Sequence, residues 1–424
     1  MRSARSAAHP PRPRERRRQR GARAPSGAPV APARAGRTPA PRRARPRVVS
    51  RQFLFCFAAN FLQNLAFTLY LHLSGFLHEL GADEVRIGII VSVTAATAIL
   101  WRPPLGTLMD ARGRRGVILA GGVLNVTVCA LYPTVRDLGP WLYVVRAAHG
   151  VAEATLFTAL MTHAADLLPP QRRTEGIGLY GISGLLPMSV SGVLGDIILR
   201  YGSYADLFHV STAFALTSLL LSLPLRDVRH PAGELPGRGF LAALAQRDLL
   251  PLWFIGLVFA TALTAQFTFV KTFVLETGIG SVGLFFTAYS IAAIVLRLGF
   301  AWVPERVGPK RALAPALGAL AVGYLLLAAA TTPTAIVVAG VGAGLGHGFT
   351  FPILSGLVVD RARTAERGAA TSIFTALFDA GALVGGPLLG AIIRSSGYGA
   401  MFLAAAAIVT LGGIVFFIVD RRAP

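Results

Sequence analysis

Charged residues are scarce in this chain of 424 residues. They make up 14% of it, whereas hydrophobic residues make up 54%. A soluble globular domain carries about 25% charged residues, so this composition argues against a cytosolic enzyme. The two cysteines, Cys56 and Cys129, lie far apart in apolar runs and form neither a disulfide framework nor a metal-binding spacing. The sequence also has no P-loop, nucleophile elbow or HExxH motif, so we expect no catalysis, cofactor or ATP-driven mechanism.

Basic charge is concentrated at the N-terminus. Residues 1–51 hold 16 arginines and one acid, Glu15, among many Pro, Ala and Gly. Such a segment cannot bury a core, so we expect a disordered cytoplasmic tail over residues 1–51. Basic tails can bind nucleic acid or anionic lipid. This one lacks the aromatic residues of a nucleic-acid module, so no nucleic-acid partner is expected.

Long apolar runs fill the rest of the chain. A bilayer-spanning helix needs about 20 mostly apolar residues, and twelve such runs are present. They are residues 53–78, 85–108, 116–134, 139–165, 176–199, 204–225, 249–275, 281–303, 311–331, 333–359, 368–393 and 398–419. A polar, Pro- and Gly-containing linker over 226–248 separates the sixth from the seventh. The sequence thus predicts an all-α integral membrane protein with six-helix bundles over 52–225 and 249–424.

The orientation follows from the basic residues of the loops. With the N-terminus inside, the inner loops and ends hold 17 Lys and Arg even without the tail, and the outer loops hold four. We therefore expect both termini on the cytoplasmic side of a bacterial plasma membrane. Nothing in the sequence suggests a multimer, so a monomer in the lipid bilayer is expected.

The second half of the chain repeats the first at an offset of 195 positions. This offset relates Arg102 to Arg297 and Gly113 to Gly308. Each copy follows an apolar run with a charged turn, GTLMDARGRR in the first half and AWVPERVGPKR in the second. Internal repeats of this kind are typical of membrane carriers.

The turn after the second span resembles a motif of the major facilitator superfamily, G-x-x-x-D-[RK]-x-G-[RK]-[RK]. The first copy is carried by Gly106, Asp110, Arg112, Gly113, Arg114 and Arg115. Arg112 lies one position after the place where the motif has a basic residue, which is Ala111 here. The second copy is carried by Glu305, Arg306, Gly308 and Lys310. The resemblance covers residues 52–420 and implies two six-helix halves, with this turn latching a cytoplasmic gate. Gly113 is expected to permit the tight reversal.

Span 4 carries a second, shorter resemblance to that family, R-x-x-x-G-x-x-x-A, at Arg146, Gly150 and Ala154. The resemblance implies that Arg146 takes part in proton coupling. Arg146, His149 and Glu153 also share one helical stripe, so Glu153 is a candidate proton-titrating group that Arg146 neutralises directly or through His149. The alternative is a static buried ion pair. No third ligand accompanies His149 and Glu153, so no metal is expected.

Other polar groups lie within the expected spans, where ionised side chains are costly and usually functional. Asp379, near the middle of span 11 and two turns after Ser372, is the strongest candidate for coupling or substrate binding, and Thr375 lies on the same face. Lys271 in span 7 could bind an anionic substrate, pair with Asp379 or extend to the outer interface. His347 in span 10 occupies the place of Glu153 in the other half.

Span 1 carries a polar stripe to which Asn64 and Gln63 contribute. Such a stripe suits hydrogen bonds to a substrate, or hydrogen bonds between helices. A glycine-rich segment of span 11, GALVGGPLLG, is similar to a motif that drug exporters of the family carry in helix 5 instead.

These features favour a secondary active transporter that moves a small organic molecule by alternating access, with proton-coupled efflux as the preferred form. A proton-coupled importer of the same fold is one alternative. A non-transporting membrane sensor or scaffold that uses the tail to recruit partners is another.

Overall fold

The computed structural model describes residues 49–169, 173–227, 240–300, 302–363 and 366–420, apart from the side chains at 106, 107, 110, 111, 173–175 and 178. The tail over 1–48 and the middle of the linker therefore lie outside the described residues. Every regular element of the described chain is a helix. The all-α prediction is confirmed.

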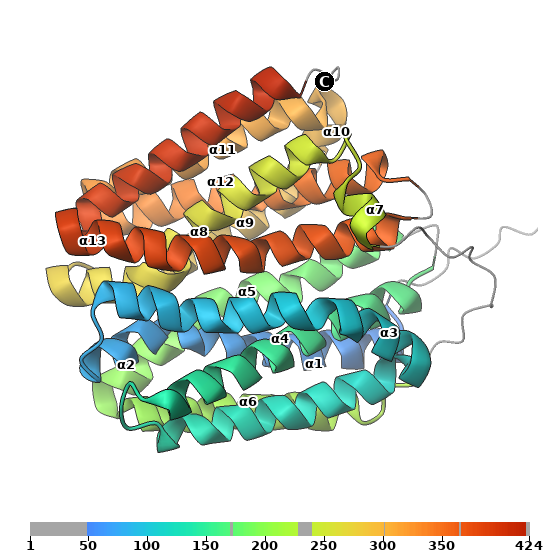
Figure 1. Ribbon diagram of the computed structural model, residues 1–424, viewed down its shortest axis with the longest axis horizontal. Helices are drawn as coiled ribbons and strands as arrows, with labels where there is room; N and C mark the ends of the chain where they lie inside the picture. The colour runs from blue at the N-terminus through green and yellow to red at the C-terminus, as the bar shows by residue number, and fades with distance from the viewer. Residues whose placement is uncertain (1–48, 170–172, 228–239, 301, 364–365, 421–424) are drawn as a thin grey trace, which may run out of the picture. The chain divides into compact units, whose positions relative to one another are not determined.

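The first half contains one bundle of helices (Figure 1). Its elements are α1 (Arg51–Thr68), η1 (Leu69–His72), α2 (Leu73–Glu79), α3 (Glu84–Leu131), η2 (Tyr132–Thr134), α4 (Pro140–Leu167), α5 (Arg173–Tyr201) and α6 (Tyr204–Ser222). Several of these helices have an N-cap residue whose side chain accepts a hydrogen bond from an otherwise unpaired backbone N–H of the first turn. Ser50 accepts from Phe53, and Ser203 forms a capping box with Asp206.

The second half repeats this arrangement. Its elements are α7 (Phe240–Leu244), α8 (Leu250–Thr277), α9 (Val282–Gly299), α10 (Val303–Val307), α11 (Pro309–Ala328), α12 (Pro333–Arg361) and α13 (Arg367–Val419). The short helix α7 lies in the segment expected to be a linker.

Ten helical segments of the described chain are long and apolar enough to cross a membrane. Helix α4, which carries Arg146 and Glu153, is not among them, and α13 counts once although Gly397 divides it into two spans. With those two corrections the ten segments correspond to the twelve expected spans.

Glycine makes the reversals at equivalent points of the two halves. Gly113 divides α3 with φ 75°, and Gly308 precedes α11 with φ 97°. A side chain is disfavoured at such positive φ values, so the expected role of Gly113 in the reversal is confirmed. We call the end of the helices with these two turns the Gly113 end. The opposite end, where Gly278 terminates α8, is the Gly278 end.

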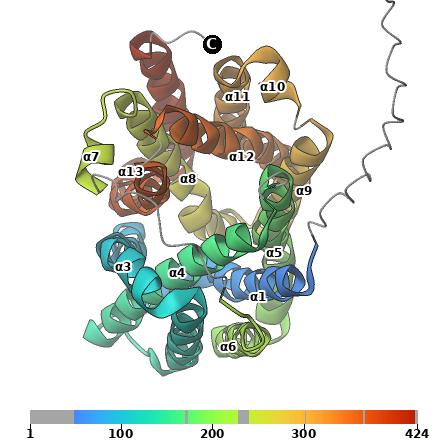
Figure 2. The ribbon, with the colours of Figure 1, turned by 90° about the vertical axis from the view of Figure 1, so that its right-hand side faces the viewer.

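Two helix pairs bring the halves together. Viewed from the Gly113 end, α3 lies beside α13 and α5 lies beside α9 (Figure 2). Each of these contacts includes a close approach between two glycines. A Cβ on Gly88 of α3 would come within 2.1 Å of the Gly386 carbonyl oxygen of α13, and a Cβ on Gly192 of α5 within 3.2 Å of Gly283 Cα of α9. The backbones therefore approach as closely as small residues allow.

Candidate functional site

An ion pair between α3 and α13 joins the two halves. Arg102 of α3 donates from Nε to Oδ2 of Asp379 on α13 at 2.8 Å, and from Nη1 to Oγ1 of Thr158 on α4 at 3.1 Å. The side chains of Arg102 and Asp379 are 8% and 17% exposed. The charge of each is thus compensated by its partner across the interface between the bundles.

Glu153 lies beside this pair. The charges that act on it are those of Asp379, Arg102 and Arg146. No hydrogen bond or ion pair ties its carboxyl group to another described residue, whereas Asp379 is bound to Arg102. Arg102 is bound to Asp379, and Arg146 is bound to Tyr132 and to backbone carbonyls, so neither guanidinium forms an ion pair with Glu153. Glu153 is the one of these two carboxyl groups without a bonded cation, so it can take up a proton without breaking an ion pair between described residues.

The rest of the span 4 stripe is bound elsewhere. Arg146 donates to the hydroxyl oxygen of Tyr132 at 3.1 Å and to the carbonyl oxygens of Ile90 and Val91 at 3.3 and 3.4 Å. His149 Nδ1 is 2.9 Å from the same Tyr132 hydroxyl. Among described residues no ion pair forms between Arg146 and Glu153, because backbone carbonyls and Tyr132 already take up the guanidinium. Both Arg146 and His149 are buried inside the first bundle.

The polar stripe of span 1 bonds to neighbouring helices of its own bundle. Asn60 donates to Ser183 Oγ of α5 at 2.7 Å, and Gln63 accepts from Asn125 of α3 at 3.0 Å. Asn64 donates to the Asn60 carbonyl of its own helix at 2.8 Å. The contacts of Asn60 and Gln63 match the interhelical alternative given for this stripe.

Lys271 and Asp379 are not paired. Lys271 lies at the Gly278 end of α8, where its side chain packs against Gly75 of α2 and the nearby acids are Asp196 and Glu79. Asp379 is bound to Arg102 instead. Sequence reasoning placed Arg102 within a span but gave it no role, although an intramembrane arginine repeated as Arg297 was a usable signal.

His347 and Thr375 lie in the second bundle. His347 of α12 is hydrogen-bonded through Nδ1 to the hydroxyl of Tyr289 on α9, and its ring lies 5.4 Å from that of Phe259. Thr375 donates to the Ser372 carbonyl of its own helix at 2.9 Å. Among described residues, no hydrogen bond or ion pair links His347 or Thr375 to the Arg102–Asp379 pair.

The halves are joined from the Arg102–Asp379 pair to the Gly278 end. Asp196 of α5 accepts the backbone N–H of Gly283, in the first turn of α9, at 2.6 Å, and its other oxygen is 3.2 Å from His72 Nε2. On the α3–α13 side, Tyr398 donates to Glu84 at 3.2 Å. Between described residues, no hydrogen bond or ion pair crosses from one half to the other nearer the Gly113 end.

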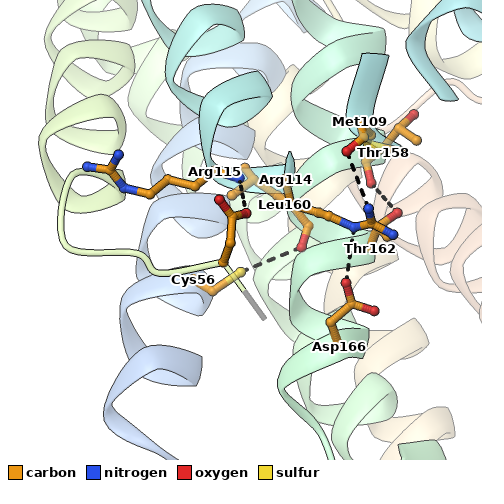
Figure 3. Close-up of polar contacts among 9 residues, drawn as sticks. Cys56, Met109, Arg114, Arg115, Thr158, Leu160, Thr162 and Asp166 are labelled. Carbon is orange, nitrogen blue, oxygen red and sulfur yellow. Dashed lines mark hydrogen bonds and ion pairs between the residues drawn. The ribbon is translucent and has the colours of Figure 1, made fainter. Parts of the chain in front are cut away.

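At the Gly113 end, the ion pairs and hydrogen bonds described here join helices of the same bundle. Arg114 donates to Asp166 of α4 at 3.2 Å and to the Met109 carbonyl at 3.3 Å (Figure 3). The backbone N–H of Arg115 donates to Asp227, which follows α6, at 2.8 Å. The surroundings of Gly106 and the side chain of Asp110 lie outside the described part, and Arg112 is exposed.

In the second bundle an aspartate after the last helix also receives basic residues, but the residues are different. Asp420, which follows α13, accepts from both Nη atoms of Arg361 at 3.0 and 2.8 Å and forms an ion pair with Lys310. Burial alone would raise the pKa of Asp420, but the hydrogen bonds and charges of Arg361 and Lys310 outweigh it and hold this pKa below its usual range. Of the remaining motif residues, Glu305 and Arg306 are exposed on α10.

The acids that receive these basic residues were missed from the sequence. Asp166, Asp227 and Asp420 all lie at helix ends, where a solvated carboxylate is the ordinary expectation. The signal that could have found two of them is the repeat itself, since Asp227 and Asp420 both follow the last span of a half.

Comparison with known proteins shows what the chain resembles. The family model of the Major Facilitator Superfamily matches residues 53–280 and, again, 252–424. The MFS-type transporter YhhS of Escherichia coli is 25% identical over 367 residues, covering 83% of this chain and 88% of that protein. The staphylopine export protein of Staphylococcus aureus is 24% identical over 379 residues, covering 86% and 93%.

Solved structures agree in fold. The nucleoside transporter NupG superposes with a TM-score of 0.71 at 14% identity, covering 88% of this chain and all of that one. The POT family transporter PepTSo superposes with a TM-score of 0.73 at 12% identity, covering 89% and 98%.

Proposed function

Because this chain belongs to the Major Facilitator Superfamily, we propose that it is a proton-coupled secondary transporter that exports a small organic molecule by alternating access. Transmembrane transport follows from the family and from relatives that are transporters. Export is supported by the similarity to the staphylopine export protein. The bilayer in question is the bacterial plasma membrane, and the protein acts there as a monomer.

The observation that carries the proposal is the Arg102–Asp379 pair with Glu153 beside it. The pair spans the interface along which one bundle must move against the other, so it links a charge balance to the position of the bundles. Protonation of Asp379 releases Arg102, which then compensates Glu153. Proton binding thereby weakens one connection between the halves.

The arrangement of contacts supports the assignment of the described state as inward-facing. The halves meet from the middle of the helices to the Gly278 end, so that end is closed. The Arg and Lys counts assign the Gly113 end to the cytoplasm, which makes this state the inward-facing one. Both termini then lie in the cytoplasm.

The test uses inside-out membrane vesicles that contain the full chain and a pH-sensitive dye. A panel of small organic compounds is screened for dissipation of a preformed proton gradient. With an active compound, Asp379→Asn and Glu153→Gln are expected to abolish compound-dependent proton flux, whereas Asp137→Asn, which alters an exposed loop carboxylate, retains it. Full flux in both membrane variants, or no active compound in the panel, would refute proton coupling.

A further inference from the structure

Arg297 is a third arginine within the expected spans, after Arg102 and Arg146, and it has no acidic partner among the described residues. It lies in the last turn of α9, where Nε donates to the Gly348 carbonyl of α12 at 3.0 Å. Its side chain is only partly exposed. An arginine inside a membrane protein pairs with an acid or faces a polar path, because the isolated charge is costly there.

The repeat shows where a partner would be expected. Arg102 and Arg297 are equivalent at the 195-residue offset, and Arg102 finds its acid on α13. The glycine contacts show which residues of α5 correspond to those of α13. Gly88 of α3 contacts Gly386 of α13, and its equivalent Gly283 of α9 contacts Gly192 of α5. Gly192 therefore corresponds to Gly386, at an offset of 194 positions. With an offset of 194, the position equivalent to Asp379 is Leu185. With an offset of 195, it is the neighbouring Gly184. Neither residue is acidic.

The residue of α5 that lies beside the guanidinium is a glycine, Gly181. A Cβ placed on Gly181 would have Arg297 Nη1 at 3.8 Å as its nearest neighbour, and a Cβ on Gly184 would meet nothing within 4 Å. Among the described side chains of α5 the one acid is Asp196, which is bound to His72 and Gly283 at the other end. Space and an uncompensated positive charge thus occur together at the α5–α9 contact.

We propose that Arg297 binds a carboxylate of the transported molecule beside Gly181 and Gly184, so that the substrate is an organic anion. The ligand carboxylate takes the place that Asp379 holds for Arg102 at the equivalent contact. A planar guanidinium suits this group because it donates two parallel hydrogen bonds to a carboxylate. The inference rests on the proposed transport function, whose proton coupling involves different residues.

The test supplies the missing carboxylate from the protein. In Gly181→Asp the new side chain starts 3.8 Å from Arg297 Nη1 and forms an internal ion pair that competes with any bound anion. Gly181→Asn has the same size without the charge and is the matched control. Arg297→Gln removes the positive charge. Arg297→Lys keeps the charge but cannot form the bidentate pair of hydrogen bonds to a carboxylate.

Binding is measured by thermal stabilisation of the purified full chain in lipid nanodiscs. The panel contains alkyl and aryl monocarboxylates, dicarboxylates and N-acyl amino acids, each beside its amide and its amine of the same skeleton, with organic phosphates as a separate arm. We expect at least one carboxylate to stabilise the wild type where its amide does not. Its half-maximal concentration should rise tenfold or more in Gly181→Asp and Arg297→Gln, and less in Gly181→Asn.

Several results would overturn the inference. They are stabilisation by amines or amides rather than carboxylates, stabilisation by phosphates alone, equal effects of Gly181→Asp and Gly181→Asn, and no stabilising carboxylate at all. Because binding is read without transport, a failed proton-flux experiment leaves this result interpretable. If Arg297→Gln does not fold, the two Gly181 variants decide.

Discussion

The Asp196 contact at the Gly278 end should stabilise the described state by an amount that can be measured. Its carboxylate accepts the Gly283 N–H across the interface at 2.6 Å, while His72 belongs to the same bundle as Asp196. Only the contact between the bundles is lost when this end opens, so it alone shifts the equilibrium. A hydrogen bond to a charged group contributes about 1.5–3 kcal/mol. Taking about 2 kcal/mol, Asp196→Ala should raise the open-to-closed ratio roughly 30-fold.

The assay is the distance between two spin labels at this end. Tyr201 on α5 and Leu275 on α8 are 79% and 49% exposed and belong to different bundles. The native thiols, Cys56 and Cys129, are buried, so labels can be directed to introduced cysteines. Asp196→Ala should move population from a short to a long distance, and Asp196→Asn, which keeps an acceptor oxygen, should have a smaller effect.

The control is Asp206→Ala. Asp206 is an exposed carboxylate at the same end, but it caps α6 and its hydrogen bonds are to Ser203 of its own bundle. An unchanged distance distribution in Asp196→Ala, or an equal change in Asp206→Ala, would refute the assignment of closure energy to the bond with Gly283.

Three further predictions follow. Gly386→Ala places a methyl group 2.5 Å from the Gly88 carbonyl oxygen, so the same labels should report a wider Gly278 end, at a cost of about 1–3 kcal/mol to the closed state. Asp420→Asn should lower the thermal stability measured at pH 7. Because the pKa of Asp420 is depressed, its stabilisation is present above the usual carboxyl pKa and is lost as the pH falls through the lowered value, so the deficit of the variant should shrink in acid. Deletion of residues 1–48 should leave compound-dependent proton flux unchanged in vesicles, whereas a recruiting scaffold would lose its function.

The sequence predicted the fold because its signals are local and repeated. Runs of apolar residues set the spans, and glycine at Gly113 and Gly308 marked the reversals in both halves. The half-length offset indicated two bundles before any contact was known. None of this requires knowing which helices of the two bundles touch.

The site was harder to predict because its partners depend on helix rotation and on contacts between bundles. Asp379 was singled out by its depth in a span, but its partner is 277 positions away. Arg146 and Glu153 share a helical stripe, yet the Tyr132 hydroxyl and two backbone carbonyls bind the arginine. Periodicity shows which residues share a face of one helix and says nothing about what a neighbouring helix offers.

The glycine contacts between α3 and α13 and between α5 and α9 have a kinetic consequence. Tightly interlocked side chains must change rotamer before two surfaces can part, and each such change adds to the activation barrier. Here main-chain atoms face main-chain atoms at Gly88 and Gly386, so at these positions the two helices can separate without a change of rotamer. A seal of this kind at the Gly278 end can exclude water and still reopen during a transport cycle.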